Sequence, residues 1–519
     1  MKVKSRDLPV VLLVGVLLTV ARGCGQDTTP KVKLHGDRFD PVRSLISETM
    51  HKHHIASVAI AAAKDGEIVL EEAFGWADME KQTAATPQSI YALASISKSF
   101  TATGLMVLIE RDLVDLDRPI NDYLGETKLV SYTGHAEQAT VRRVLQHTAG
   151  LPSHVNVFFE KETAHPPDQD ESIRRYGIIV DQPGREFVYT NFGYGVLDRV
   201  IAGVSGMSYA EFMKAEVFAP LGLTHTSVFA DPALQAYTVR HYDAKANPLA
   251  ALDFDHRGAS AVHSSVHDLL SYGMFNLHNK VPGQKRILSG QTIDMMHQPS
   301  EFTIPEEGVG EVRVGLGWAV VDLQGVRFVN STGGMPGTVT RLALVPQENA
   351  AVAIMINSDL NEIYSPWDIE WETFAAMIPG FPKRPELVAK KEERAPLPAE
   401  LQGEWKGSIK TYQGDLAAKL YIRSSRNIVL EIDGEEARPI RVQNPLGGIR
   451  FRDGVFEAPF FGSIPTDDCR RSRHVLFLRL RLRGDTLAGV ISAVAMNRTF
   501  WLPHWVELTK ARVNSTFDR

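Results

Sequence analysis

The feature that most constrains the fold of this chain is a change of pattern near residue 400. Residues 381–400 are rich in Pro, Lys and Glu, which is typical of a linker. Helical and strand patterns are mixed before this segment, whereas short strand patterns separated by turn signals follow it. A chain of 519 residues is long enough for two or three domains. We therefore expect a mixed domain over 35–380, a linker over 381–400 and a β domain over 401–512.

Strand patterns lie near both ends of the mixed segment, with helical patterns between them. Apolar runs flank Asp65-Gly66, which is a strong hairpin signal, and a second pair of apolar runs lies within 341–357. Ser208 and Glu211 have the spacing of a capping box and predict the start of a helix. The fold class predicted for this part is α/β, of the α+β kind.

The β domain is best marked by residues 476–483, where leucines at even positions alternate with Phe477 and three arginines. A period of two predicts a strand with a leucine face in the core and an arginine face in solvent. From Leu401 onward, 19 Lys and Arg stand against 13 Asp and Glu. A basic surface for an anionic partner is the alternative to a solvated face. We predict a small antiparallel β-barrel or sandwich.

The N-terminus has the pattern of a signal peptide, which we assign to residues 1–24. Three basic residues precede the apolar run Leu8–Ala21, which is too short for a comfortable membrane span. Cys24 follows Gly23 and is a candidate lipid anchor, although Arg22 is unusual beside such a cleavage site. We expect an extracytoplasmic protein: periplasmic, secreted, or a lipoprotein of a bacterial cell envelope.

Composition excludes other classes of partner. The net charge of -6 argues against a nucleic-acid partner. Cys469 is the only cysteine besides Cys24, so no disulfide is expected within the mature chain. The histidines at 51, 53 and 54 fit a solvated helix face better than a metal site, because neighbouring helical positions point in different directions. We expect no metal and no cofactor.

Ser95 and Lys98 precede an apolar-rich segment, 100–109, that we expect to be helical. Positions three apart share a helix face, so the hydroxyl and the amine would be neighbours. A serine hydroxyl needs a base to take its proton, and burial lowers the pKa of a lysine toward that role. Free N–H groups at a helix start suit a developing oxyanion. An ordinary helix start has the same spacing, so this pair alone decides nothing.

Tyr189-Thr190-Asn191 follows the turn at 182–184 and is predicted to project from a loop. A lysine ammonium beside Tyr189 would favour its phenolate, which takes a serine proton and returns it to a leaving group. Asn191 offers an amide donor and an acceptor that orient an acyl substrate. The alternative is a tyrosine packed at the edge of the core.

Ser331-Thr332-Gly333-Gly334 lies between strand-like runs at 327–330 and 339–345. Glycines on a strand edge let a ligand approach closely and leave N–H groups free. We predict that the N–H of Gly334 and that of Ser95 form an oxyanion hole. The alternative is a glycine-rich hairpin turn.

Longer stretches carry a family likeness. Residues 92–124, which contain Ser95-Ile96-Ser97-Lys98, look like a nucleophile helix and its exit, and residues 144–152 are similar to the turn downstream of it. Residues 189–197 and 218–223 match a Tyr-x-Asn region and the helix after it. Over residues 39–359 the chain therefore resembles the serine hydrolases of the class C β-lactamase and penicillin-binding-protein superfamily.

The resemblance implies a mostly antiparallel sheet flanked by helices, a helical subdomain, and an active site in the groove between them. It implies Ser95 as the acylated nucleophile, Lys98 and Tyr189 as the base pair, and Asn191 as a substrate contact, with residues 331–334 as further binding residues. Similar chains carry a lipocalin-like or related β domain after the hydrolase domain.

One position departs from the family pattern. Family members commonly have Lys or His where this chain has Ser331, and that cation pairs with a substrate carboxylate, as in β-lactams and D-Ala-D-Ala peptides. Its loss removes on the order of 1–3 kcal/mol of binding. Arg341 is the candidate to supply the missing charge. Without it, substrates that lack a terminal carboxylate are favoured.

We therefore predict a serine hydrolase that forms an acyl-enzyme on an ester or amide, with a small-molecule or peptide substrate. A D-alanyl-D-alanine carboxypeptidase or a class C-type β-lactamase is one alternative. A non-catalytic binding or self-assembling module is another. The natural substrate, the oligomeric state and the role of the β domain are left open by the sequence.

Overall fold

The computed structural model describes residues 36–160, 164–229, 231–304, 311–360, 365–385, 397–425, 427–440 and 447–511. The predicted signal peptide, Cys24 and residues 386–396 of the predicted linker lie outside these ranges. In the described ranges, no helix combines the length and the apolar character needed to cross a membrane.

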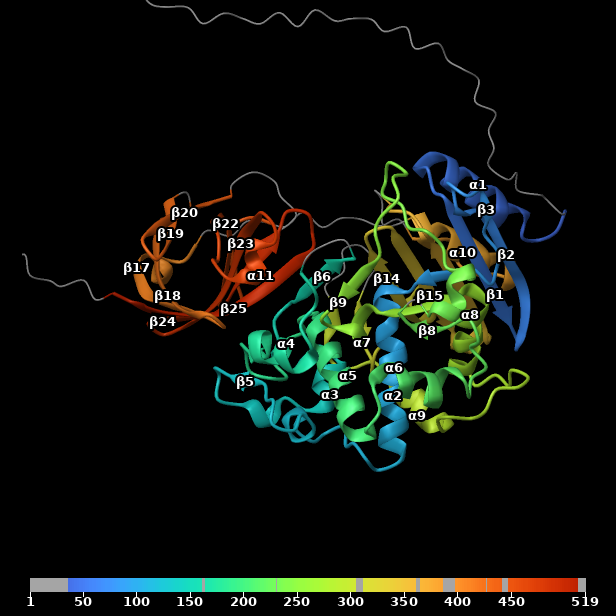
Figure 1. The fold of residues 1–519 in the computed structure, drawn as a ribbon, viewed down its shortest axis with the longest axis horizontal. Helices are drawn as coiled ribbons and strands as arrows, with labels where there is room; N and C mark the ends of the chain where they lie inside the picture. Colours follow the sequence, from blue (N-terminus) through green and yellow to red (C-terminus); the bar gives the residue numbers. More distant parts are fainter. Residues whose placement is uncertain are drawn as a thin grey trace, which may run out of the picture. The chain divides into compact units, whose positions relative to one another are not determined.

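A nine-stranded antiparallel sheet combines strands from residues 57–84 with strands from residues 303–356 (Figure 1). The predicted hairpin at Asp65-Gly66 is β1 and β2, and the second predicted hairpin is β15 and β16. Strands β1 and β16 pair in the middle of the sheet, with Ala61 opposite Ala353. In spatial order, the strands are β11 (Thr303–Ile304), β12 (Val312–Val314), β13 (Ala319–Leu323), β14 (Val326–Met335), β15 (Thr338–Val345), β16 (Ala350–Ile356), β1 (Ser57–Lys64), β2 (Glu67–Asp78) and β3 (Thr83–Ala84).

Alternate residues of β1 face the two sides of this sheet. Val58, Ile60 and Ala62 pack against α1 (Asp40–His53) and α10 (Ser365–Met377). Alanines at 59, 61 and 63 face the opposite side, where α8 (Val266–Asn276) lies and α2 (Ser97–Glu110) packs on α8. The other helices are α3 (Val141–Leu145), α4 (Gln169–Tyr176), α5 (Asn191–Ser205), α6 (Tyr209–Phe212), α7 (Arg257–Ser260), α9 (Gly290–Met296) and α11 (Asp467–Arg470).

Helix α2 runs through the interior of the helical part (Figure 1). All its residues from Ser97 to Leu108 are buried. A helix that is apolar around most of its circumference is stable only when neighbours cover every side. Lys98 is therefore carried into the core by the helix to which it belongs. The predicted capping box also forms, between Ser208 and Glu211 at the start of α6.

Short strands complete the first part of the chain. They are β4 (Ile90–Ala92), β10 (Val262–Ser265) and β8 (Ser227–Val228) in one sheet, β5 (Val130–Ser131) and β7 (Ile178–Ile179) in a parallel pair, and β6 (Val155–Phe159) with β9 (Leu252–Phe254). The predicted α+β class, with a mostly antiparallel sheet flanked by helices, is confirmed.

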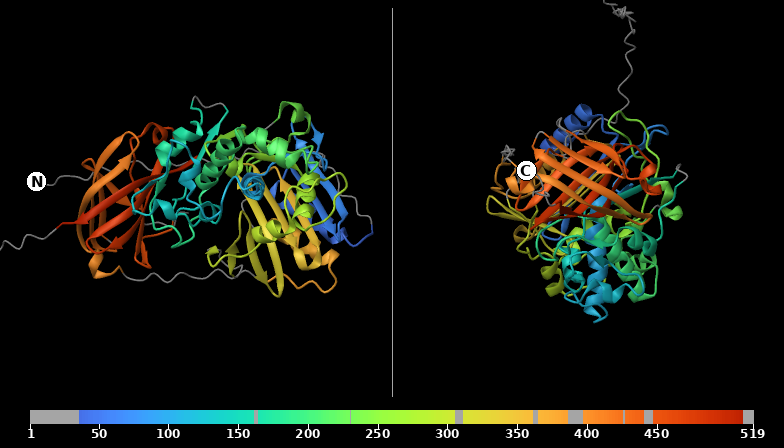
Figure 2. Two further views of the ribbon diagram at one scale, coloured as in Figure 1. Left: turned by 90° about the horizontal axis from the view of Figure 1, so that it is seen from below. Right: turned by 90° about the vertical axis from the view of Figure 1, so that its left-hand side faces the viewer.

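The C-terminal part is a closed antiparallel barrel of eight strands, in which β17 pairs with β25 (Figure 2). The leucine face of β23 lies in its interior with Trp405, as the alternation predicts. Its strands are β17 (Gly403–Thr411), β18 (Gly414–Ser424), β19 (Asn427–Ile432), β20 (Glu435–Pro439), β22 (Val455–Phe461), β23 (His474–Arg483), β24 (Thr486–Ala495) and β25 (Phe500–Lys510), and the short β21 (Arg450–Arg452) pairs with β22.

The arginine face of β23 is covered in part by charged neighbours, so the prediction of a solvated face is wrong for Arg479 and Arg481, whereas Arg483 is exposed. Arg479, Arg481 and Arg483 form ion pairs with Asp181 and Glu186 of the first part of the chain. Residues 32–519 form one compact unit by their internal contacts. A period of two shows only which face is polar, and does not distinguish water from a charged neighbouring surface.

Candidate active site

Ser95 lies in a single turn of 3₁₀ helix, Ala94–Ile96, immediately before α2. Ala94 has a φ of +49°, a left-handed conformation that costs a non-glycine residue about 1–3 kcal/mol. Such strain is found where a site requires a sharp change of chain direction. Here the turn leads the chain from β4 into the buried helix and leaves Ser95 at the mouth of a pocket.

The amine of Lys98 contacts the Ser95 hydroxyl, as the three-residue spacing predicts. Nζ lies 2.9 Å from Ser95 Oγ, and it donates to Asn191 Oδ1 at 2.7 Å and to the carbonyl oxygen of Ala259 at 3.1 Å. Only 4% of Lys98 is exposed, and this burial lowers the pKa of its amine well below 10.5. A neutral amine satisfies all three contacts, because two N–H groups reach the carbonyl oxygens while the lone pair faces the serine.

The hydroxyl of Tyr189, which lies in the loop before α5, also contacts Ser95. Tyr189 Oη donates to Ser95 Oγ at 2.8 Å, and Lys98 Nζ lies 4.8 Å from the centre of the tyrosine ring. Tyr189 is 43% exposed, and partial desolvation of its hydroxyl raises the pKa of Tyr189 to about 12. The expected phenolate is therefore not the resting form. Burial lowers the pKa of Lys98 and so disfavours the ammonium charge that would have stabilised the phenolate.

His147, for which the sequence favoured a structural hydrogen-bonding role in the turn at 144–152 over a role in the chemistry, supports Tyr189. Its ring centre lies 4.6 Å from that of Tyr189, and its Nδ1 accepts a hydrogen bond from the N–H of Thr190 at 3.2 Å. Burial, and secondly the Lys98 charge, lower the pKa of His147 to about 3. This histidine is therefore neutral and acts as an acceptor beside the tyrosine. No spacing in the sequence links position 147 to positions 189 and 190.

Asn191 contacts Lys98, and the substrate contact that the resemblance implies for it stays a prediction. Its side-chain oxygen accepts the hydrogen bond from Lys98, so it orients the amine. It is the first residue of α5, two residues after Tyr189. The residues that line the pocket beside Ser95 do not include it.

The segment 331–334 lies on strand β14 and not in a turn. The neighbouring strand β13 pairs with β14 only as far as Asn330, so Ser331–Gly334 have a strand partner, β15, on one side alone. Their other side faces a pocket of about 240 Å³. Its lining is Ser95, Lys98, Leu145, His147, Phe187, Tyr189, Tyr194, Ile304, Val314, Gly317, Trp318, Ala319, Asn330, Ser331, Thr332 and Gly334.

The two glycines of this segment have different surroundings. A Cβ on Gly333 would lie 2.0 Å from the carbonyl oxygen of Leu93, so this position holds β14 against the turn that carries Ser95. A Cβ on Gly334 would have no atom within 4 Å. Gly334 lines the same pocket as Ser95, and its place in an oxyanion hole stays a prediction.

Arg341 does not supply the charge missing at Ser331. Its guanidinium lies on the other face of the sheet, paired with Glu370 at 2.5 Å and 3.1 Å and stacked over Trp367. Ser331 itself is 8% exposed. Among the described lining residues, Lys98 is the one basic side chain with an amine or guanidinium.

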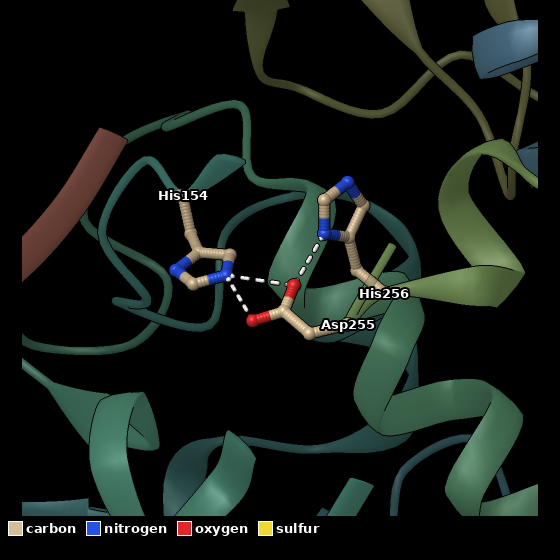
Figure 3. A group of neighbouring side chains, drawn as sticks. All are labelled: His154, Asp255 and His256. Carbon is tan, nitrogen blue, oxygen red and sulfur yellow. Dashed lines mark hydrogen bonds and ion pairs between the residues drawn. The ribbon is translucent and has the colours of Figure 1, made fainter. Parts of the chain in front are cut away.

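A buried group of His154, Asp255 and His256 lies behind the site (Figure 3). The Asp255 carboxylate is 3.1 Å from His154 Nε2 and 2.6 Å from His256 Nδ1, and it accepts from Asn156 at 2.9 Å. These residue types are metal ligands, but two ligands of one tetrahedral ion lie about 3.3 Å apart. The 2.6 Å separation is that of a hydrogen bond. The group precedes α7, whose Ala259 carbonyl holds Lys98.

The fold and site together define the class of protein. A structure of a class C beta-lactamase has a TM-score of 0.56 with this chain at 19% identity, covering 66% of this chain and 96% of that one. The structure of the octameric penicillin-binding protein homologue from Pyrococcus abyssi has a TM-score of 0.58 at 21% identity, covering 89% of this chain and 99% of that chain. These two likenesses concern the fold.

The Beta-lactamase family model matches residues 42–366, and the chain belongs to this family, as predicted. Penicillin-binding protein 4* of Bacillus subtilis (strain 168) is 27% identical over 320 residues, which are 57% of this chain and 66% of that protein. Protein flp of Staphylococcus aureus (strain MRSA252) is 28% identical over 199 residues, 38% of this chain and 39% of the relative. The chain thus matches less than two thirds of the length of these relatives.

Proposed function

We propose that this protein is a serine hydrolase that transfers the acyl group of an ester or amide to Ser95 and then to water. The observation that carries the proposal is the convergence of Lys98 Nζ and Tyr189 Oη on Ser95 Oγ, at 2.9 Å and 2.8 Å. A nucleophile with a base and a proton donor both in hydrogen-bond reach has the geometry of covalent acyl transfer.

Acylation begins with the neutral amine of Lys98. It takes the Ser95 proton while Oγ forms a bond to the substrate carbonyl carbon, and the N–H groups of Ser95 and Gly334 face the resulting oxyanion. The Tyr189 hydroxyl then donates its proton to the leaving oxygen or nitrogen as the C–O or C–N bond breaks. The ammonium of Lys98 and the phenolate of Tyr189 remain as an ion pair beside the acyl-enzyme.

Deacylation restores both groups. A water molecule attacks the acyl carbon and gives one proton to the Tyr189 phenolate. When the tetrahedral intermediate collapses, Ser95 Oγ leaves and takes the proton from Lys98. The carboxylic acid product departs, and serine, lysine and tyrosine return to the protonation states with which they began.

The pocket favours substrates without a carboxylate next to the scissile bond. A carboxylate buried there would need a cationic partner, since an unpaired buried charge is costly. Lys98 is committed to Ser95, Asn191 and Ala259, and Arg341 is bound to Glu370 on the other face of the sheet. This supports an esterase or a peptidase for neutral substrates over a D-Ala-D-Ala carboxypeptidase or a β-lactamase.

The test is intact-mass analysis of the full chain with matched substrates. A neutral ester, the same ester carrying a free carboxylate, and a penicillin are each incubated with the protein, and adduct mass and product are followed. The proposal predicts an adduct on Ser95 that is lost in Ser95→Ala, with faster turnover of the neutral ester. If no ester, amide or fluorophosphonate labels Ser95, the alternative of a non-catalytic binding module replaces the proposed hydrolase. Turnover restricted to carboxylate substrates would instead support the penicillin-recognising alternative.

A further inference from the structure

The barrel contacts the chain segment that carries Tyr189. Residues 180–189 lie between β7 and α5 and contain no helix or strand. On the side of the first part of the chain, main-chain hydrogen bonds hold this segment at three points: Val180 N–H to Gly150 O at 2.9 Å, Gly184 N–H to Thr148 O at 2.7 Å, and Val188 N–H to His147 O at 2.9 Å. A segment without regular structure depends on such contacts, and on side-chain contacts, for a fixed position.

Arginines of β23 bind the two carboxylates of this segment. Arg479 makes a bidentate pair with Glu186, at 3.0 Å and 2.8 Å. Arg481 donates to Asp181 at 2.9 Å and to Glu186 at 3.3 Å, so it joins the two acids. Arg483 adds a contact to Asp181 at 3.2 Å. Paired forks of this kind fix direction as well as distance.

The side chains from Glu186 to Tyr189 alternate between the barrel and the active site. Glu186 and Val188 line a small pocket with the barrel residues Phe477, Arg479 and Trp501. Phe187 and Tyr189 line the pocket that contains Ser95. In an extended segment, successive side chains point to opposite sides. Fixing one side of this segment against the barrel therefore fixes the direction of Tyr189 on the other.

We propose that Arg479 and Arg481 are positioning residues for acyl transfer, holding the segment 181–189 so that the Tyr189 hydroxyl meets Ser95. The proposal rests on the proposed function, since it assigns the barrel a role in the proton transfer of that reaction. The barrel thereby acts on chemistry from outside the pocket, through Glu186 and Asp181.

The test separates proton donation from general stability by the choice of leaving group. A nitrophenyl ester releases a stable anion and needs no proton donor, whereas an alkyl ester of the same acid needs one. In Arg479→Gln/Arg481→Gln, acylation of Ser95 by the alkyl ester, measured as kcat/KM, is expected to fall roughly 10- to 100-fold, with much less effect on acylation by the nitrophenyl ester. The ratio kcat/KM is used because it excludes the deacylation step that the two esters share. Tyr189→Phe is expected to show the same preference, and the arginine substitutions to add nothing further to it.

Arg438→Gln is the matched control. Arg438 is a barrel arginine on β20 whose side chain is 80% exposed and pairs with Glu436 of the barrel itself. It is expected to leave both esters unaffected. Arg479→Lys keeps the charge but loses the fork, and is expected to give an intermediate loss. If the double variant fails to fold, Glu186→Gln removes the same contact from the other side.

Three results would overturn the proposal: an unchanged alkyl-ester kcat/KM in a folded double variant, equal losses of kcat/KM on both esters, or a full additional loss in the Tyr189→Phe background. Failure of the proposed function is recognised separately, because wild-type chain would then show no label on Ser95. In that case, hydrogen exchange at the amides of Gly184 and Val188 still tests whether the arginines hold the segment 181–189. Faster exchange in the double variant supports the role of the arginines in holding the segment, and unchanged exchange overturns it.

Discussion

Substitution of alanine for the adjacent glycines 333 and 334 should have opposite effects on stability. In Gly333→Ala, the new methyl group would lie 2.0 Å from Leu93 O and 2.3 Å from Thr340 Oγ1, and these two atoms are themselves hydrogen-bonded at 2.8 Å. A backbone oxygen cannot rotate away, so β14 must move from the turn before Ser95 or the bond must break. Overpacking of this kind costs about 1–3 kcal/mol, and loss of the bond adds about 1 kcal/mol.

Gly334→Ala is the internal control, since its methyl group would meet nothing within 4 Å and alanine restricts the unfolded chain. We expect Gly333→Ala to lower the melting temperature by several degrees and to reduce acylation of Ser95, because the turn moves. Gly334→Ala should melt at or slightly above the wild-type temperature, and any loss of activity should be a loss of substrate turnover without a loss of stability. Differential scanning calorimetry measures the melting temperatures, and fluorophosphonate labelling measures the acylation of Ser95. Equal melting temperatures for the two variants would refute the packing argument.

Three further predictions concern charge. Because burial lowers the pKa of Lys98 and desolvation raises that of Tyr189 to about 12, kcat/KM should rise with pH to a plateau through a midpoint well below 10.5 and decline only at strongly alkaline pH; a midpoint near 10.5 would show that the amine is not desolvated. Ser331→Lys should raise the ratio of kcat/KM for the carboxylate ester over the neutral ester about 10- to 100-fold, with Ser331→Met as the uncharged control, and an unchanged ratio would disprove the charge argument. Arg341→Met leaves Glu370 buried without its partner and should cost about 3–5 kcal/mol on thermal unfolding while the ratio of the two esters stays constant.

Local patterns in the sequence predicted the parts of the site that a short stretch of chain determines. Ser95 and Lys98 are three residues apart, so the helix itself brings them together. The two hairpins of the central sheet likewise depend on turn residues within each hairpin. The meeting of these residues with Tyr189 depended on the family resemblance, because no local rule connects positions 94 residues apart.

The remaining features depend on which surfaces meet in the folded chain. Lys98 is held by the carbonyl oxygen of Ala259, and every residue has such an oxygen, so no residue type marks it. Arg341 lies opposite Thr332 on the adjacent strand and Ser331 lies opposite Leu342, so the side chain of Arg341 extends to α10 on the face away from Ser331. The arginines of β23 have the pattern of a solvated strand face until the acidic segment 181–186 is placed against them. Neither the composition nor the two-residue period of the strand shows which surface will lie against this face.

The alanines at 59, 61 and 63, with those at 351 and 353, have a consequence at some distance from themselves. They form a thin layer between the sheet and α8, and Tyr272 of α8 stacks on Phe100 of the nucleophile helix with ring centres 3.9 Å apart. The small size of these side chains thus lets α8, and with it the nucleophile helix, lie close to the sheet. Larger side chains at these positions would push α8 away from the sheet and, through the contact of Tyr272 with Phe100, would displace the helix that carries Lys98. The substitutions would therefore change the site without altering any residue that reacts.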